Sequence, residues 1–391
     1  MTSARLPWRV RVGLVTLPAA VAMFAVVALT PSESDPVVPP ARLATETTCL
    51  PIDPVTSVAG LNRLSTQVRT APEFQGADVG ADVQLQDGRR LWVFGDTLRS
   101  PDFEGQRFVR NSMLVFEDDC ADVVLPADHG ALIPDRDDGI GYWPMSIARI
   151  ERTGYDLVGV AVQRVRNTNA PDGVFAFENL GPSIALFIVA VGKTPQLIDV
   201  KDLGADHQGT NRPTWGAAAA VHDGWVYLYG TANPAKPYVF GFSLHVARVR
   251  PDEILDTAKW QYWDGDRWKP SACKLGTLIP AKGGVSQTLS VFEQEGRWYA
   301  VSKKDEFLGS HLVIWSAPGP TGPFTEGPAV AEIPSEASTG LLRYMPLAHP
   351  DLLPRSGTVI VSYSQNNTDF DKVDKDPFLY RPRFLRVDLP K

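Results

Sequence analysis

Residues 76–97 read GADVGADVQLQDGRRLWVFGDT, and this stretch predicts a β-hairpin whose two ends carry acids. Residues 81–86 and 90–94 are strand-like runs. Between them, Asp87-Gly88 is a dipeptide that readily adopts the positive φ angles of tight hairpin turns. The turn therefore sets which residues of the two strands face each other.

The register of this hairpin decides how its acids lie. A register that pairs Leu85 with Leu91 places Asp96 opposite Gly80 and diagonal to Asp78. The two carboxylates then share one end and one face of the hairpin, roughly 5–8 Å apart by the spacing of diagonal neighbours on paired strands. Glycosidases hold their two carboxyl groups at about this separation. A slip of one residue would turn one acid to the other face.

The composition indicates a globular and mostly β protein. The chain has 391 residues, of which 44% are apolar and 21% charged, so it can bury a large core. Its 33 prolines and 32 glycines stand between short β-branched and aromatic runs, as in an all-β chain with many turns. The net charge of -7 and the lack of a basic stripe argue against a nucleic-acid partner.

Residues 1–40 form a separate unit. Arg5, Arg9 and Arg11 precede the apolar run 13–29, and the stretch 30–40 is rich in proline and serine. This order of features predicts an export signal. Two outcomes stay open: a cleaved signal peptide and an uncleaved N-terminal anchor in the plasma membrane. Both place residues 45–391 outside the membrane, in a secreted or envelope-associated protein.

Three cysteines, Cys49, Cys120 and Cys273, allow at most one disulfide within the chain. In an oxidising compartment we expect Cys49 to pair with Cys120, and three buried structural thiols are the alternative. The cysteine spacing fits no zinc site. We expect neither a metal nor a cofactor.

The hairpin pattern recurs four more times along the chain. Each predicted turn contains a glycine, and successive turn glycines are 66, 70, 72 and 61 residues apart. They are Gly88, Gly154, Gly224, Gly296 and Gly357. Further strand-like runs fill each period, which a β-sandwich or a parallel β-helix would not explain. The sequence therefore predicts an all-β chain, a five-bladed β-propeller that forms one domain over residues 45–391, and we expect a monomer.

In a propeller, the ends of equivalent strands meet around one mouth of the central channel. Polar and aromatic residues stand at these ends, as in carbohydrate sites, where rings meet the apolar faces of sugars and polar groups bind hydroxyls. Asp78 and Asp96 are the candidate catalytic acids, and the capping of turns is their structural alternative. The candidate binding residues from this pattern are Asp82, Trp143, Gln163, Trp215, Lys304, His349, Gln365 and Arg381.

Several of these candidates also have a structural interpretation. Asp82 lies deeper in the hairpin, where it could orient a catalytic acid or only accept hydrogen bonds. Trp143 and Trp215 stand just before strands, so stacking on sugar and packing within the fold are both open. His349 could line the channel mouth or be buried. Arg381 alternates with apolar neighbours, and we expect it to face the pocket.

Five motifs carry a resemblance to a known family. They are GADVGADVQLQDGRRLWVFGDT, VRNSMLVF, TWGAAAAVHDGWVYLYG, AHPDLLPRSGTVIVSYSQNN and LYRPRF. Residues 60–391 resemble the actinobacterial endo-D-arabinanase family of glycoside hydrolases over nearly their whole length. The resemblance implies a five-bladed propeller that cleaves D-arabinofuranosyl links in cell-wall arabinogalactan or lipoarabinomannan. It also implies a paired-aspartate site on Asp78 and Asp96, and its motifs add Asn111 and Asn366 to the candidate binding residues.

Glycoside hydrolysis needs a protonated carboxyl that donates to the leaving oxygen and an ionised carboxylate that acts as nucleophile or base. Repulsion between two close acids, together with burial, raises the pKa of one of them. Sequence leaves open which aspartate is the acid and whether the anomeric configuration is retained. Two other functions also stay open: a non-catalytic wall-binding propeller, and a hydrolase of another furanoside such as L-arabinan or fructan.

Overall fold

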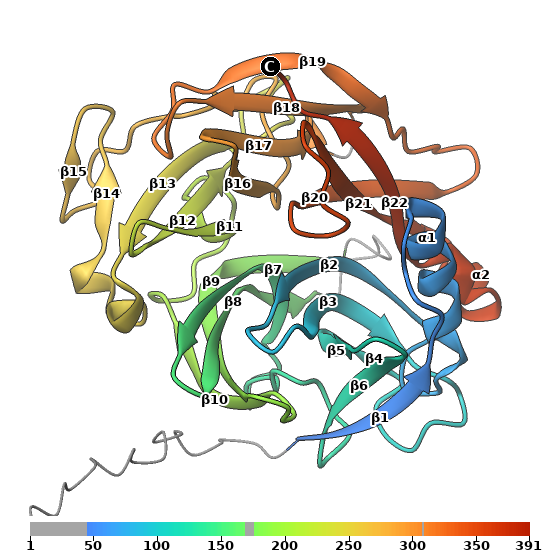
Figure 1. Ribbon diagram of the computed structural model, residues 1–391. Helices are drawn as coiled ribbons and strands as arrows, with labels where there is room; N and C mark the ends of the chain where they lie inside the picture. Colours follow the sequence, from blue (N-terminus) through green and yellow to red (C-terminus); the bar gives the residue numbers. More distant parts are fainter. Residues whose placement is uncertain (1–44, 169–175, 307–308) are drawn as a thin grey trace, which may run out of the picture. The chain divides into compact units, whose positions relative to one another are not determined.

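Five antiparallel sheets stand around a central axis in the computed structural model, which describes residues 45–168, 176–306 and 309–391 (Figure 1). Each sheet is one blade of a β-propeller, so the prediction of five blades is confirmed. The predicted export segment, residues 1–40, lies outside the described residues. Within the described part of the chain, no helix is both long and apolar enough to cross a membrane.

Blade I contains the predicted acidic hairpin. Its strands follow the order β1-β6-β5-β3-β2, with β2 nearest the axis and β4 paired to β3. The bounds are β1 (Thr45–Pro51), β2 (Gly76–Gln84), β3 (Arg90–Leu98), β4 (Phe108–Val109), β5 (Ser112–Phe116) and β6 (Cys120–Pro126).

The other four blades follow in chain order, each beginning with its strand nearest the axis. Blade II comprises β7 (Gly141–Arg152), β8 (Tyr155–Asn167), β9 (Phe177–Ala190) and β10 (Gln196–Asp202). Blade III comprises β11 (Thr214–His222), β12 (Trp225–Ala232), β13 (Ser243–Val249), β14 (Gln261–Trp263) and β15 (Trp268–Lys269). Blade IV comprises β16 (Ser290–Gln294), β17 (Arg297–Lys303), β18 (His311–Ala317) and β19 (Thr325–Glu332). Blade V comprises β20 (Leu341–His349), β21 (Thr358–Asn367) and β22 (Arg381–Asp388).

Turn glycines and apolar contacts between blades shape the propeller. All five predicted turn glycines lie between the two strands of a blade that are nearest the axis, with φ from 68° to 89°. Side chains of neighbouring sheets fill the space between them; Leu91 and Val93 of blade I, for example, share one core with Val160 and Phe187 of blade II. The period of the turns therefore corresponds to the stacking of one blade on the next.

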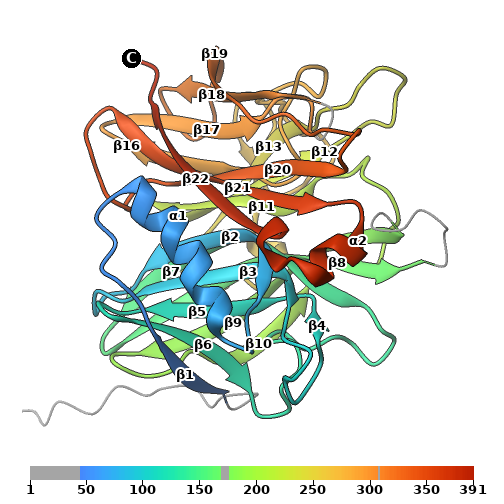
Figure 2. The same cartoon turned by 90° about the vertical axis from the view of Figure 1, so that its right-hand side faces the viewer.

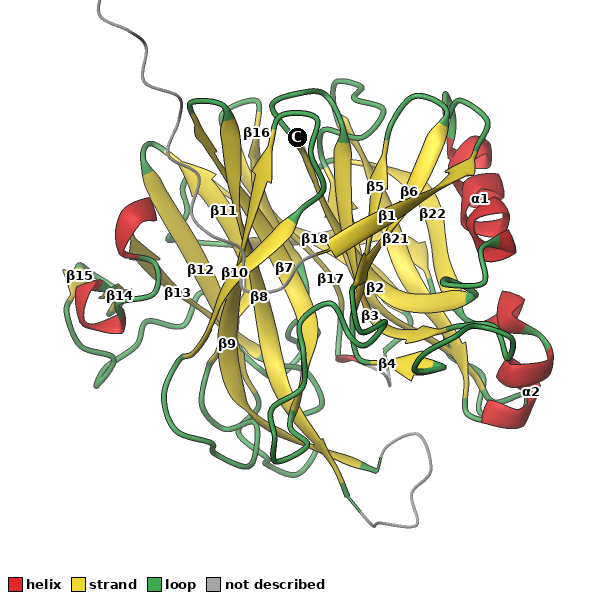
Figure 3. Ribbon diagram, turned by 90° about the horizontal axis from the view of Figure 1, so that it is seen from below, coloured by secondary structure: helices red, strands yellow, loops and turns green. Residues whose placement is uncertain are grey.

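Two α-helices, α1 (Val58–Gln67) and α2 (Phe370–Lys375), lie outside the sheets on one side of the propeller (Figure 3). Short 3-10 helices occur at Val68–Thr70, Pro251–Glu253, Thr257–Lys259 and Pro377–Leu379. Helix α1 runs beside β22, the outer strand of blade V (Figure 2). The amide of Asn62 on α1 donates to the carbonyl of Phe384 at 3.0 Å and accepts from its N–H at 3.1 Å. The helix thus covers the outer edge of blade V and forms hydrogen bonds with backbone groups there. In the neighbouring blade IV, a fourth strand covers the equivalent edge.

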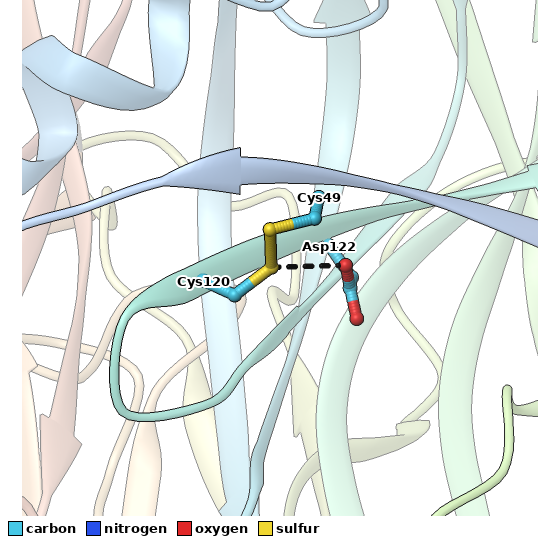
Figure 4. The surroundings of a disulfide bond; sticks show 3 residues. All are labelled: Cys49, Cys120 and Asp122. Atoms are coloured by element: carbon cyan, nitrogen blue, oxygen red, sulfur yellow. Dashed lines mark hydrogen bonds between the residues drawn. A yellow bond between two sulfur atoms is a disulfide. The ribbon is translucent and has the colours of Figure 1, made fainter.

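A disulfide joins Cys49 on β1 to Cys120 on β6, which confirms the expected pairing (Figure 4). The two residues belong to adjacent paired strands, with their Cα atoms 5.6 Å apart. Asp122 lies beside the bond, with Oδ1 3.3 Å from Cys120 Sγ. Cys273 is free and exposed. The disulfide therefore fixes the outermost strand of blade I.

The register of the first hairpin differs from the prediction. The prediction pairs Leu85 with Leu91, whereas Val83 pairs with Leu91 in the structure. The reason is the loop, which consists of residues 86–88 because the N–H of Leu85 donates to the carbonyl of Arg89 at 2.8 Å. The pairing has moved by two residues, an even number, so the side chains of residues 81–84 and 90–93 keep their predicted faces.

Bulges interrupt four of the five strands nearest the axis. The affected positions are Val79 and Gly80 in β2, Met145 in β7, Gly216 in β11 and Met345 in β20. Val79 and Met345 have φ values of 63° and 44°, a region in which a residue with a side chain is strained. Because bulges redirect the side chains beside them, they decide what these strands present to the axis.

Candidate active site

A cavity of about 110 Å³, open to solvent, lies near the bulged ends of these strands. Four blades line it, and none of the described lining residues belongs to blade III. The lining comprises Asp78, Val79, Gly95 and Asp96 from blade I, Trp143, Pro144, Met145, Gln163 and Phe177 from blade II, Gln287 and Thr288 from blade IV, and Leu342, Tyr344, Met345 and Asn366 from blade V. The structure therefore brings the two predicted acids to one cavity.

Asp78 is surrounded by hydrogen-bond donors. The hydroxyl of Tyr344 donates to its Oδ2 at 2.7 Å. The hydroxyl of Tyr380 and the backbone N–H of Asp96 also contact the carboxylate. Burial raises the pKa of Asp78 to about 6, and these hydrogen bonds oppose the rise because they favour the ionised form.

Asp96 has fewer donors and a charged neighbour. The indole N–H of Trp143 donates to its Oδ1 at 2.7 Å. Burial and the negative charge of Asp78 raise the pKa of Asp96 well above its usual range, against the opposing effects of Trp143 and the positive charge of Arg110. More hydrogen-bond donors surround Asp78 than Asp96, so the hydrogen bonds favour the ionised form of Asp78 over that of Asp96.

The shape of the hairpin sets the position of the Asp78 carboxylate. In the β2–β3 pair, Asp78 lies opposite Gly95 and Asp96. A Cβ atom on Gly95 would collide with Oδ1 of Asp78, so only glycine leaves room for this carboxylate. The N–H of Val79 donates to Ser364 Oγ at 2.9 Å, which ties the bulge to blade V. The acids are thus held by backbone geometry as well as by their hydrogen bonds.

Three predicted binding residues line the cavity: Trp143, Gln163 and Asn366. The Trp143 ring packs edge-on against Phe177, with ring centroids 4.6 Å apart, while its N–H holds Asp96. Gln163 is paired with Trp143 across β7 and β8 and is 3% exposed. The amide of Asn366 donates to the hydroxyl of Tyr344 at 3.5 Å.

Trp215, Lys304 and Gln365 are predicted binding residues that the structure does not place on the cavity. The Trp215 ring packs on Tyr262, with centroids 5.4 Å apart, within blade III. Lys304 Nζ forms an ion pair with Glu326 at 2.6 Å. Gln365 is buried in the middle strand of blade V. Spacing from the turn glycines located the correct end of each strand but not the direction of the side chains.

His349 and Asp82 form a buried hydrogen-bonded pair at the other end of the blades. His349 is the last residue of β20, whereas the cavity residues of blade V stand at the beginning of that strand, so the predicted place of His349 at the mouth is corrected. Its Nε2 lies 2.8 Å from Ser362 Oγ. Burial of Asp82 is outweighed by its interactions with His349 and Arg90, which lower the pKa of this carboxyl.

Asn111 and Arg381 are also predicted binding residues with buried contacts away from the cavity. The Asn111 amide donates to the carbonyls of Ile133 and Tyr142, both at 3.0 Å, and so fixes the chain that leads into β7. The guanidinium of Arg381 donates to Thr66 on α1. Both side chains therefore hold elements together.

Sequence reasoning missed four residues around the acids: Tyr344, Tyr380, Phe177 and Gln287. Tyr344 stands one residue before the Met345 bulge in β20, and the sequence gives no sign of that bulge. Tyr380 directly precedes β22 and reaches the acids from there, with its hydroxyl donating to the carbonyl of Asp96 at 2.8 Å. A search for aromatic residues at strand starts would have found Phe177 and Tyr380.

The fold and the cavity define a five-bladed propeller with an acid pair at its axis. The chain belongs to the family described as "Domain of unknown function (DUF5005)", whose model matches residues 61–389. No curated protein matches the chain. The family match does not show membership of the endo-D-arabinanase family, so that resemblance stays a prediction.

Solved structures that are similar to this chain come from several bacteria. A Bacteroides ovatus protein described as "a putative hydrolase" has a TM-score of 0.59 at 19% identity, over 84% of this chain and 89% of that chain. A GH43_1 enzyme from Xanthomonas citri complexed with xylotriose has a TM-score of 0.44 at 12% identity, over 84% and 93%. A xylan beta-1,4-xylosidase from Bacillus halodurans has a TM-score of 0.44 at 11% identity, over 76% and 50%. The likeness to the Bacteroides ovatus protein, at 19% identity, concerns the fold alone.

Proposed function

We propose that this protein is a glycoside hydrolase that cleaves D-arabinofuranosyl linkages in cell-wall arabinogalactan or lipoarabinomannan. The observation that supports this most is the pair Asp78 and Asp96, two carboxyl groups on one cavity whose neighbours favour different protonation states. Glycoside hydrolysis needs one acid of each kind. The choice of D-arabinan rests on the motifs that resemble endo-D-arabinanases.

The hydrogen bonds around the pair suggest a role for each acid. Asp78, which receives the hydrogen bond of Tyr344, is the ionised group and attacks the anomeric carbon. Asp96 is the protonated group and donates its proton to the glycosidic oxygen as that bond breaks. In the second step Asp96 takes a proton from water, the water oxygen bonds to the anomeric carbon, and the bond to Asp78 breaks. Both carboxyls then regain their starting states.

The position of the pair favours retention of configuration. Asp78 lies opposite Gly95 and Asp96 at an irregularity of the β2–β3 pair, and Cβ atoms of directly opposed residues on paired strands are about 4.5–5.5 Å apart. Retaining glycosidases hold their carboxyl groups about 5–5.5 Å apart, whereas inverting enzymes need room for a water molecule between acid and base. We therefore expect a covalent glycosyl intermediate on Asp78.

The cavity lining suits a neutral sugar. Trp143 and Phe177 supply aromatic surface, Gln163 and Asn366 supply amides, and none of the described lining residues is lysine or arginine. The proposed partner is therefore an uncharged arabinan of the cell wall. The predicted export segment would bring residues 45–391 to that polymer, either released or tethered to the plasma membrane.

The test is turnover of Asp78→Asn and Asp96→Asn on purified arabinogalactan, followed by product sizing. Each variant should lose about 10³-fold or more, because each lacks a nucleophilic or proton-transfer role worth several kcal/mol. Affinity for the polymer should persist, since other blades supply the remaining cavity contacts. Release of oligosaccharides by the wild type identifies an endo enzyme.

The competing hypotheses give different results in the same experiment. A wall-binding propeller would retain the polymer without releasing products from wild type or variants. A hydrolase of another furanoside would act on L-arabinan or fructan and leave D-arabinan intact. Near-wild-type turnover in both variants would place the chemistry elsewhere.

A further inference from the structure

Gln163 carries a buried hydrogen-bond donor without a partner. Its side chain lines the cavity and is 3% exposed, and its Nε2 is buried without a hydrogen bond in the structure. Its Oε1 accepts from Nε2 of Gln287 at 2.5 Å, which fixes the orientation of the amide. A buried polar group without a partner is costly, so it indicates an acceptor that arrives with a ligand.

Gln287 is itself held at both backbone groups. Its N–H donates to Glu306 Oε2 at 2.8 Å, and its carbonyl accepts from Thr231 Oγ1 at 2.7 Å. Glu306 follows β17 of blade IV, whereas Thr231 lies on β12 of blade III. Two blades therefore position Gln287, whose side chain then reaches blade II.

The inner strand of blade III packs closely against blade II. The inner strand of blade III carries glycine and alanine at residues 216–220. Gly216 has φ 89°, and a Cβ atom there would collide with Cβ of Ala161 on blade II. This close approach leaves no room for a larger side chain at residue 216, and the Gln163–Gln287 hydrogen bond joins blades II and IV.

We propose that the Gln163–Gln287 pair reads a hydroxyl group of the sugar bound beside the acids. This inference rests on the proposed function and deepens it. Gln163 donates its free N–H to the sugar oxygen, and Gln287 is a positioning residue that aims the donor. Because Gln163 faces Trp143 across β7 and β8, and Trp143 holds Asp96, the sugar unit that is read lies next to the acid pair.

The test uses Gln163→Met, Gln287→Met and the double variant, with kcat/KM measured on solubilised D-arabinan. Methionine keeps the length of the side chain without the amide. Gln163→Met should lower kcat/KM about 10- to 100-fold, the effect of one lost hydrogen bond in a closed site. Gln287→Met should lower it less, and the double variant should equal Gln163→Met because Gln287 acts through Gln163. Gln294→Met, at a half-buried glutamine outside the cavity, is the matched control and should behave as wild type.

The outcomes separate this inference from the proposed function. Wild-type kcat/KM in Gln163→Met, or a double variant whose loss is the product of the single losses, would overturn the inference while the enzyme remains active. If the wild type shows no hydrolysis, calorimetric titration with arabinan oligosaccharides replaces the rate measurement. At least tenfold weaker binding by Gln163→Met would then support the amide pair even as the enzymatic proposal fails, and equal or absent binding would overturn it.

Discussion

Asp78 and Asp96 are the same chemical group with different surroundings. The hydroxyl of Tyr344 and other donors surround Asp78, whereas Trp143 is the one side-chain donor to Asp96 among the described residues, and Asp96 lies beside a negative charge. Donors stabilise the ionised form and a like charge destabilises it, so these surroundings favour the proton on Asp96. Neutral tyrosine and tryptophan side chains therefore influence the protonation of the two acids, a role that charged residues often have in other proteins.

The first prediction concerns stability and pH for Asp78→Asn. The pKa of Asp78 is raised in the folded protein from 3.8 to about 6, so between these values the folded state binds more protons than the unfolded state. Wild-type stability therefore falls as pH rises through this window. Asp78→Asn lacks the carboxyl group, so its stability does not fall for this reason. The variant should match the wild type near pH 3.5 and melt at a higher temperature at pH 7.

Asp82→Asn is the opposing control for that measurement. The pKa of Asp82 is lowered by its partners, so its contribution to stability is fully present above the unfolded pKa of 3.8 and is lost only below it. This variant should melt lower than the wild type by a nearly constant margin between pH 4.5 and 7. A Tm difference for Asp78→Asn that does not grow across the same range would contradict the raised pKa.

The second prediction concerns Trp143→Phe and the acid role of Asp96. Phenylalanine keeps the contact with Phe177 but cannot donate to Asp96. The pKa of Asp96 should rise further, which moves the alkaline limb of the kcat profile upward by about one unit. The acid limb, set by Asp78, should stay near pH 6. Equal shifts of both limbs, or a lower kcat with an unchanged profile, would mean that Trp143 does not control this proton.

At the scale of elements, the bulges of the inner strands build the cavity. Sequence predicted the hairpins because turn glycines and alternating runs follow from local rules, but it gave no sign of the bulges. Val79 illustrates why: a β-branched residue is among the least expected at positive φ, and it is held there by a hydrogen bond to Ser364 on the last blade. Such a contact depends on residues far away in the chain. The sequence still predicted that both acids lie on one face of the hairpin. The observed register of residues 81–84 and 90–93 differs from the predicted one by two residues, and an even difference leaves their side chains on the same face.

The third prediction concerns Gly95→Ala, which tests whether the hairpin positions Asp78. The new methyl group would occupy the place of Asp78 Oδ1 and displace the carboxylate. A shift of about 1 Å in a reacting group costs roughly 10²-fold in rate, so turnover should fall by about that factor while the blade stays folded.

Gly319→Ala is the matched control for this substitution. A Cβ atom on Gly319 meets nothing within 4 Å, and this glycine does not have a positive φ. Its turnover and Tm should equal those of the wild type. If Gly95→Ala keeps full turnover, the carboxylate has another position available and the hairpin does not constrain it.

At the scale of the whole molecule, the number of blades was readable because each blade repeats the same turn chemistry. The positions of His349 and Arg381 were not readable, since they depend on how blade V meets blade I and helix α1. His349 links β20 of the last blade to Asp82 on β2 of the first. This contact closes the ring, so a residue expected to touch substrate instead joins the two ends of the blade series.

The fourth prediction follows for His349→Leu. Removal of the imidazole leaves Asp82 with Arg90 and takes away the partner of Ser362. The free energy of unfolding should fall by about 3 kcal/mol, as when one member of a buried pair is removed. Turnover at low temperature should be unchanged, because the site lies at the other end of the blades.

His311→Leu is the control, since His311 is an exposed histidine on β18. It should change the free energy of unfolding by less than about 0.5 kcal/mol. If His349→Leu loses turnover without losing stability, His349 acts in the active site and the structural role is wrong.

The two acids come from a single hairpin of blade I, whereas blades II, IV and V supply the rest of the cavity wall. The hairpin that carries the acids and much of the rest of the cavity wall can therefore evolve separately. Substitutions at lining residues that do not hold the acids, such as Phe177 and Gln287, can reshape which sugar fits, whereas Trp143 and Tyr344 must stay because they position Asp96 and Asp78. Proteins that share this hairpin should accordingly keep one chemistry and diverge in their sugars, so the hairpin alone is a poor guide to substrate.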